Sequence, residues 1–168
     1  VTHIHLSSIH FGVDDKSKKY IHLNDYEPTN KIFDKVWSQL VEAKELDIQI
    51  TLMIGGAGGA FNTLFSDFPY YYNLLYQLLK EKSIITGIDL DIEESVNLND
   101  VKMLIRQLKK DFPNYELSMA PVQYAIQNDE PGMGGFIYKD LYNSEEGKMI
   151  DYFCGQFYSD FSKTAYDQ

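Results

Sequence analysis

An acidic run at the end of an apolar segment is the stretch of this chain best suited to chemistry. Asp89, Asp91 and Glu93 are separated from one another by single apolar residues. In a β-strand every second side chain points to the same face, so the three carboxylates would lie together, with neighbours starting about 6.7 Å apart. Carboxylates this close in a cleft cannot all remain ionised, so at least one pKa is expected to rise. A carboxylic acid that stays protonated near neutral pH is what protonation of a glycosidic oxygen requires.

Metal binding is the main alternative chemistry for the polar residues of the chain. The acidic run by itself also fits a solvated strand end or a divalent-cation site. Histidines at 3, 5 and 10 could bind a transition metal. In a regular strand, however, His10 falls on the opposite face from His3 and His5, and no acidic ligand accompanies them in the sequence. No metal site is therefore expected there.

The elements that must position the acidic run follow from the hydrophobic periodicity. Strands are expected at 2–11, 20–25, 48–54, 84–92, 115–120 and 150–158, and helices at 31–46, 70–82, 98–110 and 138–143. The polar, glycine-rich segment 122–135 is expected to be a loop. Strands that alternate with helices of ten or more residues predict right-handed βαβ units around a parallel sheet. An open doubly wound sheet and a closed eight-stranded barrel both fit this α/β pattern, and 168 residues suit one domain.

Composition excludes several classes of partner. The formal net charge is -10 and the isoelectric point is about 4.7, so the chain would repel nucleic acid and anionic membranes, whereas neutral polysaccharides carry no such penalty. No apolar run reaches the roughly 18 residues of a membrane helix. The first residues show no signal-peptide pattern, which leaves the compartment open. The single cysteine, Cys154, excludes an intrachain disulfide, and its apolar surroundings predict a buried, inert thiol.

Residues 86–93, with the sequence TGIDLDIE, resemble the DGxDxDxE signature of glycoside hydrolase family 18, the chitinase-type family. Thr86 replaces the first aspartate of that signature. Three further stretches resemble motifs of the family in the same order along the chain, at 52–56, 117–121 and 156–158. The first of these is similar to an SxGG strand, with Met53 where serine is usual. The resemblance implies a TIM (β/α)8 barrel, of which residues 1–168 form a single, partial catalytic domain.

The resemblance covers roughly barrel strands 2 to 6, because strands 1, 7 and 8 have no counterpart in the chain. A barrel of this kind normally has about 250 residues, so the chain is expected to be part of a larger protein. The family places a tryptophan from its final strand under the reactive sugar. Trp37, the one tryptophan here, lies instead on the apolar stripe of an expected helix and should belong to the core.

The family resemblance implies hydrolysis of β-1,4 bonds between N-acetylglucosamine units by a retaining mechanism in which the substrate's own acetamide attacks. Neither a cofactor nor a metal is implied. Glu93 would act as general acid and then base, Asp91 would orient the acetamido group, and Asp89 would tune Asp91. Tyr158 would donate a hydrogen bond to the acetamide carbonyl. The residues expected to bind substrate are Gln156, Met119, Gly55 and Gly56.

Two alternatives to chitin hydrolysis remain at this point. One is a chitinase-like lectin that binds chitin or related glycans without cleaving them, against which the presence of Glu93 counts. The other is an endo-β-N-acetylglucosaminidase that cleaves the core of N-glycans. The resemblance favours an extracellular protein. The chain taken alone is expected to be a weak enzyme or an inactive one, and to self-associate through exposed strand edges.

Overall fold

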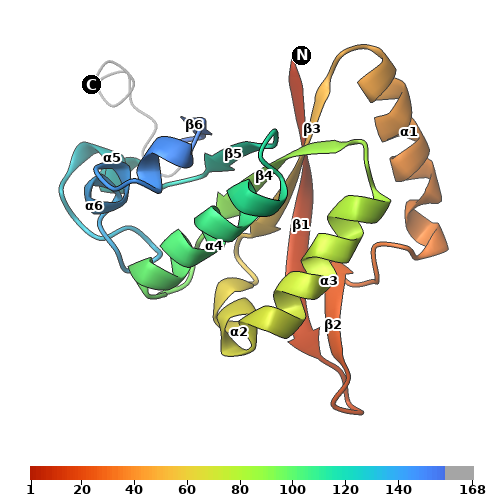
Figure 1. Ribbon diagram of the computed structural model, residues 1–168, viewed down its shortest axis with the longest axis horizontal. Helices are drawn as coiled ribbons and strands as arrows, with labels where there is room; N and C mark the ends of the chain where they lie inside the picture. The colour runs from red at the N-terminus through yellow and green to blue at the C-terminus, as the bar shows by residue number, and fades with distance from the viewer. Residues whose placement is uncertain (158–168) are drawn as a thin grey trace.

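One mixed sheet organises the chain, and the computed structural model describes residues 1–157 of it (Figure 1). Its six strands lie in the order β2-β1-β3-β4-β5-β6. They span β1 (His3–Val13), β2 (Lys19–Leu23), β3 (Gln49–Gly55), β4 (Ile85–Asp91), β5 (Glu116–Met119) and β6 (Tyr152–Phe153). All neighbouring pairs are parallel except β1 with β2, which forms an antiparallel edge. The predicted α/β class and parallel sheet are confirmed.

Helices connect the parallel strands. They span α1 (Asp34–Glu45), α2 (Phe61–Ser66), α3 (Phe68–Glu81), α4 (Leu98–Asp111), α5 (Gln123–Gln127) and α6 (Tyr138–Tyr142), with 3-10 turns at Lys31–Phe33 and Gly147–Met149. Figure 1 shows α3 and α4 lying across the viewer's side of the sheet. The short helices α2 and α5 were not predicted, because five or six residues are too few to establish a helical period. Among residues 1–157, none of the helices is long and apolar enough to cross a membrane.

The core lies between the sheet and these helices. Its most buried residues have at most 1% of their surface exposed. The middle strands contribute Ile50, Leu52, Ile54, Ile88 and Leu90, and the long helices contribute Leu75, Leu79, Val101, Leu104 and Ile105. Trp37 of α1 is also buried, and its indole N–H donates to the carbonyl of Pro28 at 2.8 Å. The prediction that Trp37 is a core residue is confirmed. The apolar side of β4 therefore faces the helices, which leaves the acidic side for the other face of the sheet.

An irregularity in β1 changes which of its side chains share a face. Between Leu6 and Ile9 the pairing of β1 with β3 shifts, so that β1 contains one residue more than its partner. The extra residue reverses the strand alternation, as in a β-bulge. His10 therefore lies on the same sheet face as His5, and the expected opposite placement was wrong. The His10 ring contacts the hydroxyl of Ser8 and the carbonyl of Gly59, both at 2.7 Å.

The C-terminal strand is shorter than expected. Residues 150–158 were predicted as a strand, but β6 spans only Tyr152–Phe153, at the edge of the sheet. Because Cys154 follows this short edge strand, its side chain is exposed rather than buried. Gln156 then forms an isolated parallel bridge with Val122, which brings the chain back beside the carboxyl ends of the strands.

Candidate active site

The three carboxylates of the acidic run gather at the end of β4. Asp89 and Asp91 are buried, with 2% and 7% of their surface exposed, and Glu93 is half-buried just beyond the last residue of the strand. Asp89 pairs with Met53 of β3 and Asp91 pairs with Gly55, so the carboxylates lie beside the glycine-rich end of β3. The run is thus not a solvated strand end.

Gln156 connects the two outer carboxylates. Its side-chain amide donates to Asp91 Oδ1 at 2.9 Å and to the carbonyl of Ala120 at 2.9 Å, and it lies 3.3 Å from Glu93 Oε1. Gln156 is itself buried, and its backbone is held by the bridge to Val122. One amide group therefore holds Asp91 and Glu93 side by side, although 63 residues separate it from Glu93 in the sequence.

Burial and like charge raise the pKa of Asp91 to about 7. Burial is the largest cause, followed by the charges of Glu93 and Asp89, and a hydrogen bond with Glu93 acts in the same direction. The hydrogen bond from Gln156 opposes this rise. The expectation that at least one pKa of the acidic run rises is confirmed. Near neutral pH, Asp91 can therefore hold a proton beside Glu93.

Asp89, the deepest of the three carboxylates, has partners on the neighbouring strand β5 and on β1, which lies beyond β3 in the sheet. The hydroxyl of Ser118 on β5 donates to Asp89 Oδ1, and His5 Nδ1 on β1 lies 3.8 Å from Asp89 Oδ2. The other ring nitrogen of His5 lies 3.3 Å from the hydroxyl of Tyr152. Sequence reasoning had not identified Ser118 or His5 as partners of Asp89. The signal that identifies Ser118 is the register of the sheet, in which it pairs with Asp89.

Gly55 and Gly56 bring the backbone of β3 against that of β4. Both have positive φ, +96° and +82°, which is the left-handed region that favours glycine. The N–H of Gly56 donates to the carbonyl of Asp91 at 2.9 Å. A Cβ atom on Gly55 would overlap that same carbonyl oxygen and lie 2.6 Å from the ring of Phe61. The glycine pair thus fixes the backbone of Asp91.

We predict that Gly55→Ala lowers the free energy of unfolding by about 2 to 5 kcal/mol, because unfavourable φ and a clash with backbone act together. Gly56→Ala is the matched control. Its φ is equally unfavourable, but its Cβ would meet only the end of Met53, at 3.2 Å, and a carboxylate oxygen of Asp91, at 3.5 Å. Denaturant titration of both variants measures the difference. Equal losses would show that close packing against Asp91 is unimportant.

Met119, which was expected to bind substrate, is not brought to the carboxylate site. Met119 is completely buried and pairs with Leu90, a core residue, whereas the preceding Ser118 pairs with Asp89. Since alternate residues of a strand face opposite ways, Met119 belongs to the helix-facing side and does not line the carboxylate site. Tyr158 lies outside the described residues.

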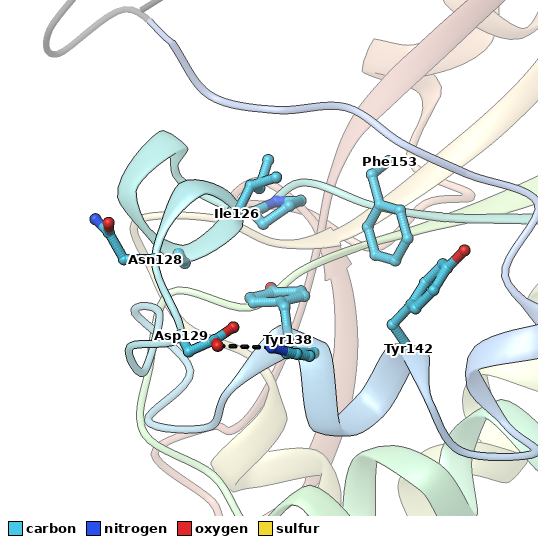
Figure 2. Close-up of a pocket in the computed structure, with 9 residues that line it drawn as sticks. Ile126, Asn128, Asp129, Tyr138, Tyr142 and Phe153 are labelled. Carbon is cyan, nitrogen blue, oxygen red and sulfur yellow. Dashed lines mark hydrogen bonds and ion pairs between the residues drawn. The ribbon is translucent and has the colours of Figure 1, made fainter. Parts of the chain in front are cut away.

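A separate cavity of about 340 Å³ lies between α5, α6 and β6 (Figure 2). Its walls are mostly apolar, with Ile126, Tyr142 and Phe153 around the opening. The ion pair of Asp129 with Lys139, at 2.6 Å, lies at one side. None of the three carboxylates lines this cavity. The candidate active site is therefore the carboxylate cluster rather than this cavity.

The chain is similar to solved structures of one enzyme family. A fungal endo-beta-N-acetylglucosaminidase from glycosyl hydrolase family 18 has 30% identity and a TM-score of 0.87, and chitinase ChiC from Aspergillus fumigatus has 28% identity and a TM-score of 0.88. Each match covers 99% of this chain and 61% of the other chain. A GH18 chitinase from Pseudoalteromonas aurantia shares the fold at 17% identity and a TM-score of 0.69, over 93% of this chain and 60% of that one.

No family model matches the chain, and no curated protein matches it in sequence. The chain spans about three-fifths of the length of the two most similar of these solved structures, namely 61% of each. Each of these two matches extends over 99% of this chain and so includes the parallel sheet and the acidic end of β4. The chain therefore has the chitinase-type fold of glycosyl hydrolase family 18 and spans part of that family's TIM barrel.

Proposed function

We propose that this protein is a glycosidase that hydrolyses β-1,4 bonds between N-acetylglucosamine units, as in chitin, with Glu93 as the acid and base. The observation that carries the proposal is the pair of the buried Asp91 and the half-buried Glu93, held together by Gln156. The pKa of Asp91 is raised to about 7 by burial and by its acidic neighbours, so the pair can carry one proton near neutral pH. Two relatives with 28% or more identity are a chitinase and an endo-beta-N-acetylglucosaminidase.

In the proposed reaction the acetamide oxygen of the substrate attacks the anomeric carbon. As this bond forms, the glycosidic C–O bond breaks and Glu93 gives its proton to the leaving oxygen. Asp91 accepts a hydrogen bond from the acetamide N–H and stabilises the positive charge that develops on the cyclic intermediate. Glu93, now a carboxylate, takes a proton from the water that opens this intermediate. The product keeps its anomeric configuration and no cofactor is consumed.

The remaining residues have supporting roles in this proposal. Asp89, held by Ser118, adds the negative charge that helps to keep a proton on the outer pair. Gly55 and Gly56 let the backbone of β3 approach the site, where a sugar ring would pack. Tyr158 would donate its phenol proton to the acetamide carbonyl.

Cleavage within the N-glycan core is the second candidate function. It is favoured by one specific observation, the 30% identity to a fungal endo-beta-N-acetylglucosaminidase. The same carboxylates would act on either substrate, since both contain an N-acetylglucosamine unit on the non-reducing side of the bond that is cleaved.

The test is to incubate the full-length protein with chito-oligosaccharides and, separately, with a glycopeptide that carries an N-glycan core. Mass spectrometry identifies which is cleaved, and proton NMR of the first product reports its anomeric configuration. We expect β-configured product, and no cleavage of matched glucosamine oligomers that lack the acetyl group. Initial α product, or equal cleavage of the deacetylated oligomers, would contradict the mechanism. Binding of the oligomers without turnover would favour the lectin alternative.

A further inference from the structure

Glu94, the residue after the proposed acid, is attached to the loop that follows β3. Its Oε1 atom accepts hydrogen bonds from the backbone N–H groups of Ala60 and Phe61, the second at 2.6 Å. These two N–H groups stand at the start of α2, where backbone donors have no partner within the helix. Gly59 passes so close to the Glu94 carboxylate that a Cβ atom there would lie 3.0 Å from it. The loop is thus shaped around this side chain.

The loop is also held from its other side. The imidazole of His10 on β1 contacts the carbonyl of Gly59 through Nδ1 at 2.7 Å, and its Nε2 lies 2.7 Å from the hydroxyl of Ser8. Because a carbonyl oxygen only accepts, Nδ1 must carry a proton and donate to Gly59. The N–H of Gly56 donates to Asp91. A loop fixed at both ends can serve as a rigid support for Glu94.

Glu93 needs such a support because it lies beyond the strand. β4 ends at Asp91, whose carbonyl accepts from Gly56, and the chain is held again at Val96, whose N–H donates to Gly134 at 3.0 Å. Glu93 and Glu94 lie between these two points, and Glu93 is only half-buried. Within this interval, the two hydrogen bonds of Glu94 attach the backbone to the loop after β3, one peptide unit away from the proposed acid.

We propose that Glu94 is a positioning residue, whose tether to Ala60 and Phe61 fixes the backbone that carries Glu93. The expected effect of Glu94 on turnover rests on the proposed function. The tether, meaning the two hydrogen bonds from Ala60 and Phe61 to Glu94, does not depend on that function. It also gives the adjacent glutamate, Glu94, a role different from that of Glu93. The Glu94 carboxylate is occupied by two backbone donors, whereas the Glu93 carboxylate faces Gln156 and Asp91.

The test compares Glu94→Ala, Glu94→Gln and a control, Glu145→Ala, in the full-length protein. Glu145 is exposed and pairs only locally with Lys148, so its removal should leave turnover unchanged. Glu94→Ala should lower kcat by about 10- to 100-fold with little change in KM, because a displacement of about 1 Å at a reacting group costs on this order. Glu94→Gln should retain most of the activity, since an amide oxygen can accept the same two hydrogen bonds.

Hydrogen exchange at the amides of Ala60 and Phe61 gives a second measurement that needs no turnover. Exchange should be slow in the unchanged protein and in Glu94→Gln, and faster in Glu94→Ala. Unchanged exchange in Glu94→Ala would overturn the tether, and unchanged kcat would overturn the positioning role. A Glu94→Gln variant as inactive as Glu93→Gln would make Glu94 an acid instead. If the unchanged protein cleaves no glycoside, the proposed function fails while the exchange experiment still decides the tether.

Discussion

Glu93→Gln is expected to lower the turnover of N-acetylglucosamine oligomers by at least about 100-fold, because glutamine cannot give a proton to the leaving oxygen. Glutamine keeps the size of the side chain and its hydrogen-bonding capacity. The amide of Gln156 can still donate to the side-chain oxygen at position 93, so the site should keep its geometry. Affinity for a non-hydrolysed oligomer should therefore remain close to that of the unchanged protein.

The measurement is the rate of release of a fluorescent leaving group from a chitobiose glycoside, together with the binding affinity for an oligomer. Glu145→Gln, a change of the same kind at an exposed site, serves as the control for effects of lost charge. Full activity in Glu93→Gln would refute the assignment of Glu93 as the acid. Loss of binding together with activity would instead indicate that the substitution disturbs the site.

Asp91→Asn is expected to stabilise the protein at alkaline pH while it lowers turnover. The pKa of Asp91 is about 7 in the folded protein, above its ordinary value of 3.8, because burial and the neighbouring carboxylates disfavour its ionised form. Between these two values the folded state binds more protons than the unfolded state. The stability contributed by the protonated carboxyl is therefore complete below about pH 4 and is lost as the pH rises through 7.

Asparagine resembles the protonated carboxyl and has no charge to lose. Its oxygen can accept from Gln156 and its amide can donate to Glu93. We expect the variant to be more stable than the unchanged protein by about 1 to 3 kcal/mol at pH 8, with little difference at pH 4. Turnover should fall, because an amide cannot carry the negative charge that the proposed role of Asp91 requires.

Denaturant titrations at several pH values between 4 and 8 measure this difference. Asp129→Asn is the matched control, since Asp129 is exposed in its ion pair with Lys139. A stability difference that does not change with pH would show that Asp91 is not the group that holds the extra proton. A variant that is more stable but less active than the unchanged protein would show that Asp91 lowers stability while it supports function.

Local periodicity was sufficient to predict most of the elements. The i, i+2, i+4 spacing of Asp89, Asp91 and Glu93 identified β4 and one acidic face, because strand alternation depends only on neighbouring residues. The amphipathic stripes likewise predicted α1, α3 and α4, including the burial of Trp37. The resemblance of residues 86–93 to the DGxDxDxE signature identified the family fold that the solved structures share.

The register of the sheet, meaning which residues of neighbouring strands pair, could not be predicted from the sequence. The extra residue in β1 reversed the expected face of His10, because a bulge depends on pairing with β3 rather than on the sequence of β1 itself. The same limit applies to Met119. It was expected at the sugar pocket, but its pairing with Leu90 places it in the core and puts Ser118 beside Asp89.

The sequence by itself therefore determined the class of fold and the acidic strand end, and it suggested the chemistry that we propose for the carboxylates. Only the tertiary structure decided which contacts distant groups make with the carboxylates, including those of Gln156, which the family resemblance had already placed at the site. Gln156 reaches Asp91 across 65 positions of the chain, and Glu94 reaches the start of α2 across 33 or 34. The physical reason is that periodicity is a property of neighbouring residues, whereas the partners of a buried carboxylate are set by how strands and loops pack together.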